Sequence, residues 1–113
     1  MDCIFCKIIN KEIPSQIIYE DEDVLAFRDI NPEAPVHVLV IPKQHIASFN
    51  ELTKDHGPLL VKIMAAIQTI AINEKIADSG YRIVNNCGEQ GGQTVGHLHF
   101  HLLGGREMLW PAG

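Results

Sequence analysis

The sequence has no long apolar run, and its N-terminus has none of the features of an export signal. No stretch approaches the roughly 18 consecutive apolar residues of a membrane-spanning helix, and the opening residues MDCIFCK lack the basic and apolar regions of a signal peptide. The three cysteines are an odd number, which argues against a disulfide framework. We therefore expect a cytoplasmic protein with no membrane partner.

Basic residues are also few. Nine Lys and Arg residues stand against fourteen Asp and Glu residues, and the formal net charge is −5. Proteins that bind nucleic acids electrostatically need a basic surface that displaces counterions, so we expect no nucleic-acid partner. A small phosphorylated ligand is a different case, because backbone amides and a few local donors bind one phosphate without a net positive charge.

The length and the hydrophobic pattern predict one α+β domain over residues 1–113. A chain of 113 residues that is 46% hydrophobic is long enough to bury a core. Alternating and β-branched runs predict strands at 17–19, 24–28, 36–41, 81–85 and 98–103. A short helical turn is predicted at 7–11, and one long helix with Thr53 as its cap, Pro58 in its first turns and Ser79-Gly80 at its end. These elements predict an antiparallel sheet of about five strands, one long helix and a short N-terminal helix.

Three histidines dominate the last predicted strand. His97, His99 and His101 alternate with apolar residues, so we expect the imidazoles to share one outward face while the apolar side chains pack on the core. Same-face neighbours on a strand are roughly 6.6 Å apart, which separates His97 from His101 by about 13 Å. Zinc–nitrogen bonds are about 2 Å long, so one ion cannot bind all three rings. Neighbouring histidines are therefore expected to serve different sites.

A glycine-rich loop precedes these histidines. Residues 88–94, GEQGGQT, lack the G-K-[ST] ending of a P-loop and lead into a strand instead of a helix. Taken alone, the loop fits an ordinary turn. Beside three histidines, its glycines, amide and hydroxyl indicate a phosphate-binding loop that faces a nucleophile.

The sequence resembles the histidine triad (HIT) family. Residues 93–103, QTVGHLHFHLL, resemble the family signature His-φ-His-φ-His-φ-φ, and residues 29–45, DINPEAPVHVLVIPKQH, resemble its other shared segment. The ending GGREMLWPAG at 104–113 is similar to the Hint branch, the histidine triad nucleotide-binding proteins. This resemblance implies a homodimer in which the C-terminal tail reaches toward the neighbouring site.

The resemblance also implies a reaction. The middle histidine of the triad, here His99, would attack the α-phosphorus of a nucleotide derivative and become transiently nucleotidylated. His101 and His37 would orient it, contact phosphate oxygens and relay a proton to the leaving group, with the division of this work left open. For His37, simple outward alternation on its strand is the alternative interpretation.

A purine nucleotide is the implied ligand. Asp29 would accept hydrogen bonds from the ribose hydroxyls, while Ile30 and Phe27 would line the purine slot, although ordinary core packing also explains both apolar residues. The positions implied around the phosphate and the leaving group are Asn86, Gly92, Gln93 and Thr94, together with His99 and His101. Thr94 stands where the branch commonly has Ser, and threonine retains the hydroxyl group.

The resulting hypothesis is a purine nucleoside phosphoramidase or related nucleotide hydrolase that releases nucleoside 5′-monophosphate and needs no cofactor for catalysis. Two alternatives remain open at this point. One is a dinucleoside polyphosphate hydrolase, which the Trp110-Pro111 tail disfavours. The other is a nucleotide-binding or protein-interaction module with incidental turnover.

The N-terminal Cys3-x-x-Cys6 motif lies far from any partner in the sequence, and its distance to His45 fits no zinc-finger spacing. The related galactose-1-phosphate uridylyltransferases, however, bind zinc through a similar Cys-x-x-Cys, a histidine like His45 and the first triad histidine. The resemblance therefore implies a structural zinc ion on Cys3, Cys6, His45 and His97. A pair of unmetallated thiols is the alternative.

Overall fold

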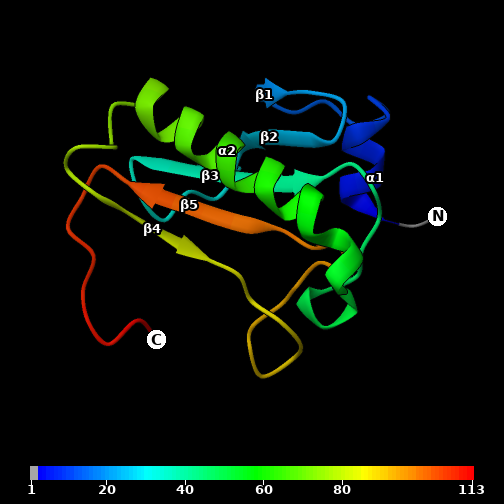
Figure 1. The fold of residues 1–113 in the computed structure, drawn as a ribbon. Helices are drawn as coiled ribbons and strands as arrows, with labels where there is room; N and C mark the ends of the chain where they lie inside the picture. Colours follow the sequence, from blue (N-terminus) through cyan, green and yellow to red (C-terminus); the bar gives the residue numbers. More distant parts are fainter. Residues whose placement is uncertain (1–2) are drawn as a thin grey trace.

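A single antiparallel sheet organises the chain in the computed structural model, which describes residues 3–113. Its five strands have the order β1-β2-β3-β5-β4 (Figure 1). They are β1 (Ile17–Glu20), β2 (Val24–Arg28), β3 (Val36–Pro42), β4 (Tyr81–Val84) and β5 (Phe100–Gly104). Each neighbouring pair is antiparallel. The predicted α+β fold, with one long helix and a short N-terminal helix, is confirmed.

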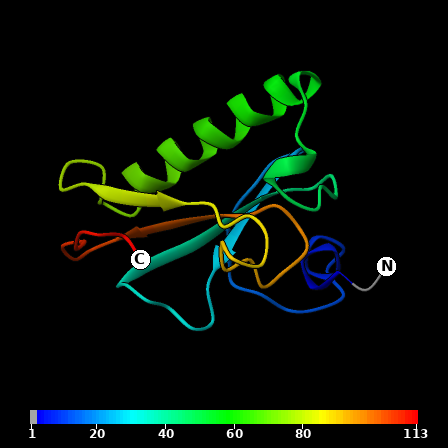
Figure 2. The same cartoon turned by 90° about the horizontal axis from the view of Figure 1, so that it is seen from below.

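The two helices lie on opposite faces of the sheet (Figure 2). The long helix α2 (Gly57–Asn73) packs its buried side chains against one side of β2, β3 and β5. The short helix α1 (Ile4–Ile9) packs Phe5 and Ile8 against the other side of β2 and β3. Successive strand residues point to opposite faces, so Ala26 of β2 contacts the α2 layer while Leu25 and Phe27 contact the α1 layer.

The helices differ from the sequence prediction at their ends. Thr53 caps a short 3-10 helix, η2 (Lys54–His56), and α2 begins only at Gly57. It ends at Asn73 instead of Ser79-Gly80, because Lys75 takes a left-handed conformation, with φ 63°, that closes the last turn. The predicted turn at 7–11 was also misplaced. Helix α1 begins at Ile4, where the Cys3 thiol accepts a hydrogen bond from the Cys6 backbone N–H.

Four strands also differ from their predicted limits. Strand β1 extends one residue further, to Glu20, and β4 ends one residue earlier, at Val84. Strand β3 includes Pro42, which pairs with Val24 at the end of the ladder. Strand β5 begins at Phe100, so His97 and His99 precede the regular ladder, contrary to the predicted strand at 98–103. Between these two histidines the backbone bonds outside the ladder, since the Leu98 N–H donates to the carbonyl of Ile46, in the connection that follows β3 (2.6 Å).

Another short 3-10 helix, η1 (Phe49–Glu51), lies in the connection between β3 and α2. Within residues 3–113, none of the helices has the length and apolar character needed to cross a bilayer.

Candidate active site and candidate metal centre

The register between β3 and β5 brings two histidines together. His101 pairs with Leu39 of β3, so His37, two residues earlier on the same face, is its diagonal neighbour. His37 Nε2 lies 2.9 Å from His101 Nδ1, and the two ring centroids are 5.2 Å apart. The carboxylate of Asp29 approaches the same nitrogen of His37 at 3.4 Å. The structure thus places His37 beside the triad, where it does more than alternate outward on its strand.

Backbone groups determine which nitrogens of this pair carry protons. The Glu33 backbone N–H donates to His37 Nδ1 (3.0 Å), so the His37 proton lies on Nε2 and is donated to His101 Nδ1. The remaining proton of a neutral His101 therefore lies on its Nε2. Burial, together with the charges that His99 and His37 can carry, lowers the pKa of His101 to about 4. His101 is consequently a neutral hydrogen-bond donor at physiological pH.

His99 is oriented by the residue two positions before it. Its Nδ1 donates to the His97 carbonyl at 2.7 Å, which leaves the lone pair of the neutral ring on Nε2. Nε2 has no hydrogen-bond partner within residues 3–113, yet no buried side-chain nitrogen or oxygen in this part of the chain lacks one. Solvent therefore reaches Nε2, although only 4% of the His99 surface is exposed. A neutral imidazole with an accessible lone pair is a competent nucleophile.

A mainly apolar pocket of about 300 Å³ opens beside His99 and His101. Asp29 and Thr94 also line it, as do Phe27 and Ile30, with 3% and 91% of their surfaces exposed. Phe27 is therefore both a core residue and a pocket residue, as the two sequence interpretations allowed. The wall that the sequence reasoning missed comes mainly from helix α1, and its residues are Ile4, Phe5 and Ile8. Their helical spacing was the available signal.

The predicted phosphate loop lies at the edge of this pocket. Gly92, with φ 83°, and Thr94 are both exposed. The Gln93 side chain instead holds the loop together, because its amide donates to the carbonyls of Ala47 (2.8 Å) and Val95 (2.9 Å). Asn86 is half-buried and does not line the pocket. The phosphate contacts of these residues stay predictions.

Asn85, which the sequence analysis did not single out, supports the nucleophile segment. Its side-chain N–H donates to the His99 carbonyl at 2.9 Å. The expectation that the histidine face is outward was wrong in one respect. Helix α1 covers the part of this face that precedes β5, so His97 and His99 are buried at 0% and 4% exposure.

A second cluster of side chains lies beside the triad and includes the first triad histidine, His97. One ligand atom each from Cys3, Cys6, His45 and His97 lies within 4.8 Å of every other. His97 Nδ1 lies 3.3 Å from Cys3 Sγ, 3.6 Å from Cys6 Sγ and 3.2 Å from His45 Nδ1. The predicted four-residue set is therefore brought together, with sulfur and nitrogen donors of the kind that zinc prefers.

The protonation pattern of this cluster also fits a metal ion. His97 Nε2 donates to the Pro42 carbonyl at 2.9 Å, so the lone pair of the neutral ring lies on Nδ1 and faces the two sulfurs. Burial lowers the pKa of His97, which favours this neutral form. In the metal-free cluster, burial and the neighbouring Cys3 thiol raise the pKa of Cys6 to about 11. Without a cation, the Cys6 thiol is therefore protonated.

The fold and these two sites together define an α+β protein with a histidine triad that leads into strand β5. A family model described as "Scavenger mRNA decapping enzyme C-term binding" matches residues 2–110. The chain is 47% identical over 107 residues to the purine nucleoside phosphoramidase of Escherichia coli (strain K12), covering 95% of this chain and 90% of that protein. It is 50% identical over 112 residues to a 14 kDa zinc-binding protein of Zea mays, covering 97% and 87%.

Among solved structures, a HIT family hydrolase from Legionella pneumophila Philadelphia 1 superposes with a TM-score of 0.98 at 49% identity. The superposition covers 99% of this chain and 100% of that one. The chain belongs to the histidine triad family.

Protonation of His101 should destabilise the metal-free fold in acid. Because its folded pKa of about 4 lies below the usual 6.5, the unfolded chain binds this proton between those values and the folded chain does not. The free energy of unfolding should therefore fall as the pH drops from 7 toward 4. His101→Asn should lose less stability over this range in urea denaturation with a chelator present. An equal loss in wild type and variant would contradict the assignment.

Proposed function

We propose that this protein is a hydrolase of nucleotidyl bonds, specifically a purine nucleoside phosphoramidase with His99 as its nucleophile. The observation that carries the proposal is the hydrogen bond from His99 Nδ1 to the His97 carbonyl, which leaves the Nε2 lone pair accessible beside the pocket. The similarity to the purine nucleoside phosphoramidase of E. coli supports a phosphoramidate substrate.

The reaction then has two displacements at phosphorus. His99 Nε2 attacks the α-phosphorus and forms a P–N bond while the bond to the leaving amine breaks, and the amine takes a proton from His101 Nε2. Water next attacks the same phosphorus and returns a proton to His101, the bond to His99 breaks, and nucleoside 5′-monophosphate leaves. Splitting the hydrolysis in this way replaces one difficult step by two easier ones.

His101 and His37 support both displacements. His101, neutral and carrying its proton on Nε2, donates a hydrogen bond to a phosphate oxygen or to the leaving nitrogen as charge develops. His37 fixes the orientation of His101 and is itself held by the Glu33 N–H. Asp29, which approaches the same His37 nitrogen, lines the pocket, where its carboxylate accepts hydrogen bonds from the two ribose hydroxyls.

The nucleotide occupies the pocket between α1 and the 29–30 turn. Phe27 forms the apolar floor and the almost fully exposed Ile30 flanks the purine. In this proposal Gly92 and Thr94 supply backbone and hydroxyl donors to the phosphate, and Asn86 contacts the phosphate or the leaving group. The Gln93 side chain holds the loop together.

Replacing the nucleophile should abolish turnover. We expect His99→Asn to lower kcat for an adenosine phosphoramidate by at least about 10³-fold, since removal of a covalent nucleophile is among the most costly catalytic changes, while AMP binding is largely retained. Rapid quenching of the wild-type protein should trap a nucleotidyl group on His99. A matched histidine variant away from the pocket, His56→Asn, should retain turnover. Near wild-type activity of His99→Asn would refute the mechanism.

We also infer that Cys3, Cys6, His45 and His97 hold a structural zinc ion. Two thiolates and two imidazoles complete a tetrahedral set with no open position for a substrate. The Pro42 carbonyl on His97 Nε2 supplies the outer contact that metal-bound histidines usually make. The similarity to the 14 kDa zinc-binding protein of Zea mays supports this metal ion.

Metal analysis tests the zinc site. Protein purified without chelator should contain about one zinc per chain, and Cys3→Ser/Cys6→Ser should contain none. Cys87→Ser removes a thiol outside the cluster and should retain the full zinc content. An absence of zinc from the wild-type protein, even after reconstitution under reducing conditions, would rule the site out.

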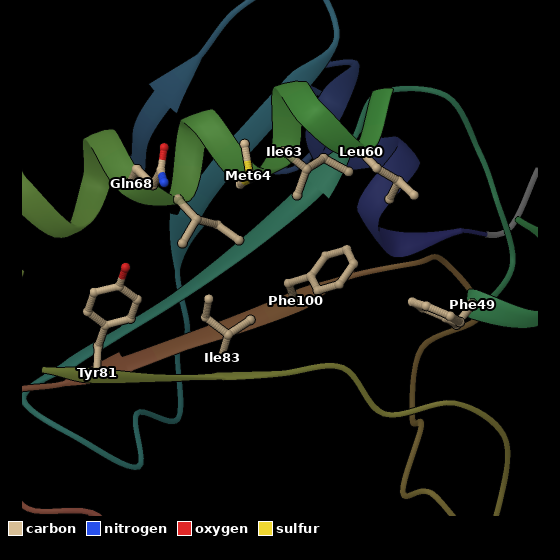
Figure 3. Close-up of a pocket in the computed structure, with 9 residues that line it drawn as sticks. Phe49, Leu60, Ile63, Met64, Gln68, Tyr81, Ile83 and Phe100 are labelled. Atoms are coloured by element: carbon tan, nitrogen blue, oxygen red, sulfur yellow. The ribbon is translucent and has the colours of Figure 1, made fainter. Parts of the chain in front are cut away.

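A homodimer completes the proposed function. An apolar groove of about 290 Å³ lies between α2 and the β4 edge, and Figure 3 shows Met64 and Gln68 of α2 facing Tyr81 and Ile83 of β4 across it. Met64 and Ile83 are about half-exposed, and β4 is the last strand of the sheet. A second copy of this chain would cover both the groove and the open strand edge. The exposed Trp110 follows Leu109, whose carbonyl accepts a hydrogen bond from Arg82 (2.9 Å), so the C-terminal tail lies near the same edge strand.

Sedimentation tests this assembly. At micromolar concentration the wild-type protein should sediment as a dimer, and Ile83→Lys should sediment as a monomer because it places a charge in the apolar groove. Gln16→Lys adds the same charge near β1, at the opposite edge of the sheet, and should remain dimeric. A monomeric wild-type protein would overturn the proposal.

A further inference from the structure

The metal cluster and the nucleophile share one backbone segment. His97 faces the cluster through Nδ1, and its carbonyl accepts the hydrogen bond that orients His99. A displacement of His97 therefore moves the acceptor that fixes the nucleophile.

Helix α1 provides a second connection between the two sites. Cys3 and Cys6 lie at its start, and Phe5 lies between them in the sequence. The Phe5 ring contacts His99 and His97 edge-on, with centroid distances of 5.1 Å and 5.9 Å. Ile4, Phe5 and Ile8 of the same helix form one wall of the nucleotide pocket. The residues that would hold the metal ion thus also position the pocket wall.

The regular β-ladder does not hold the triad segment at His97 and His99. The ladder between β3 and β5 ends at the pair Val40 and Phe100, so His97 and His99 lie beyond it. Without a metal ion, α1 contacts the triad segment through apolar packing and weak thiol hydrogen bonds of 3.3 to 3.6 Å. A metal ion bonded to both cysteines and to His97 would join α1 directly to that segment. The conformational freedom that nucleotide binding must otherwise remove would then already be lost.

We propose that metal binding at the Cys3/Cys6/His45/His97 cluster and nucleotide binding beside His99 are thermodynamically coupled, with Phe5 and the His97 carbonyl as the positioning links. Zinc increases the affinity for AMP, and AMP increases the affinity for zinc by the same factor, because coupling between binding sites is reciprocal. This coupling rests on the proposed zinc site and nucleotide pocket, and adds a regulatory role to a cluster that does no phosphorus chemistry.

Two equilibrium measurements on the full chain test the coupling without any assay of turnover. AMP affinity is measured by calorimetry in zinc-loaded and metal-free protein, and zinc affinity by competition with a chelator, with and without saturating AMP. We expect a change of about tenfold in both, within the usual range for coupled sites. In Cys3→Ser/Cys6→Ser, zinc should leave AMP affinity unchanged, whereas Cys87→Ser should behave as wild type.

Phe5→Leu tests the link itself. This variant keeps all four metal ligands, so it should bind zinc while the coupling factor falls toward one. If wild-type protein binds zinc and AMP, each without effect on the other, the coupling is wrong and both proposed sites stand. If it binds no zinc, the metal site and the coupling fail together. If it binds zinc but no AMP, the proposed nucleotide function and the coupling fail.

Discussion

The hydrogen bond from His99 Nδ1 to the His97 carbonyl is the contact on which the chemistry of this protein depends. It fixes the tautomer and the ring orientation of the nucleophile at once, so that the Nε2 lone pair stays accessible in an otherwise buried ring. The bond is local and bridges two residues, which is possible because the chain leaves regular β-structure before Phe100. A continuous strand would direct this carbonyl toward a ladder partner.

The same principle of backbone control extends to the other histidines. The Glu33 N–H sets the tautomer of His37, His37 sets that of His101, and the Pro42 carbonyl sets that of His97. One row of alternating histidines thereby supplies two separate chemistries. His99 and His101 face the nucleotide pocket, while His97 directs its lone pair into a cluster with two thiols. Phe5 of helix α1 contacts both His97 of the metal cluster and His99 of the pocket.

Much of this arrangement could be predicted from the sequence, and the failures have physical causes. Strand β2 was predicted at its observed limits because its apolar run is bounded by an acidic turn and by Asp29. The four cluster residues were identified through resemblance to a family, since the spacing of Cys6 and His45 carries no local signal. Helix α1 was misplaced because a cysteine thiol caps it, a type of cap that is not among the favoured N-cap residues. The burial of His99 could not be foreseen, because it depends on where that helix packs.

Nitrogen-15 NMR of histidine-labelled protein, free of nucleotide and near pH 8, where imidazoles are neutral, tests the central claim most directly. The account predicts that His99 carries its proton on Nδ1 and that its Nε2 has the chemical shift of an unprotonated imidazole nitrogen. His99→Asn identifies the resonance by its loss. A proton found on Nε2 of His99 would contradict the account, because the nitrogen assigned to attack phosphorus would then have no lone pair to donate.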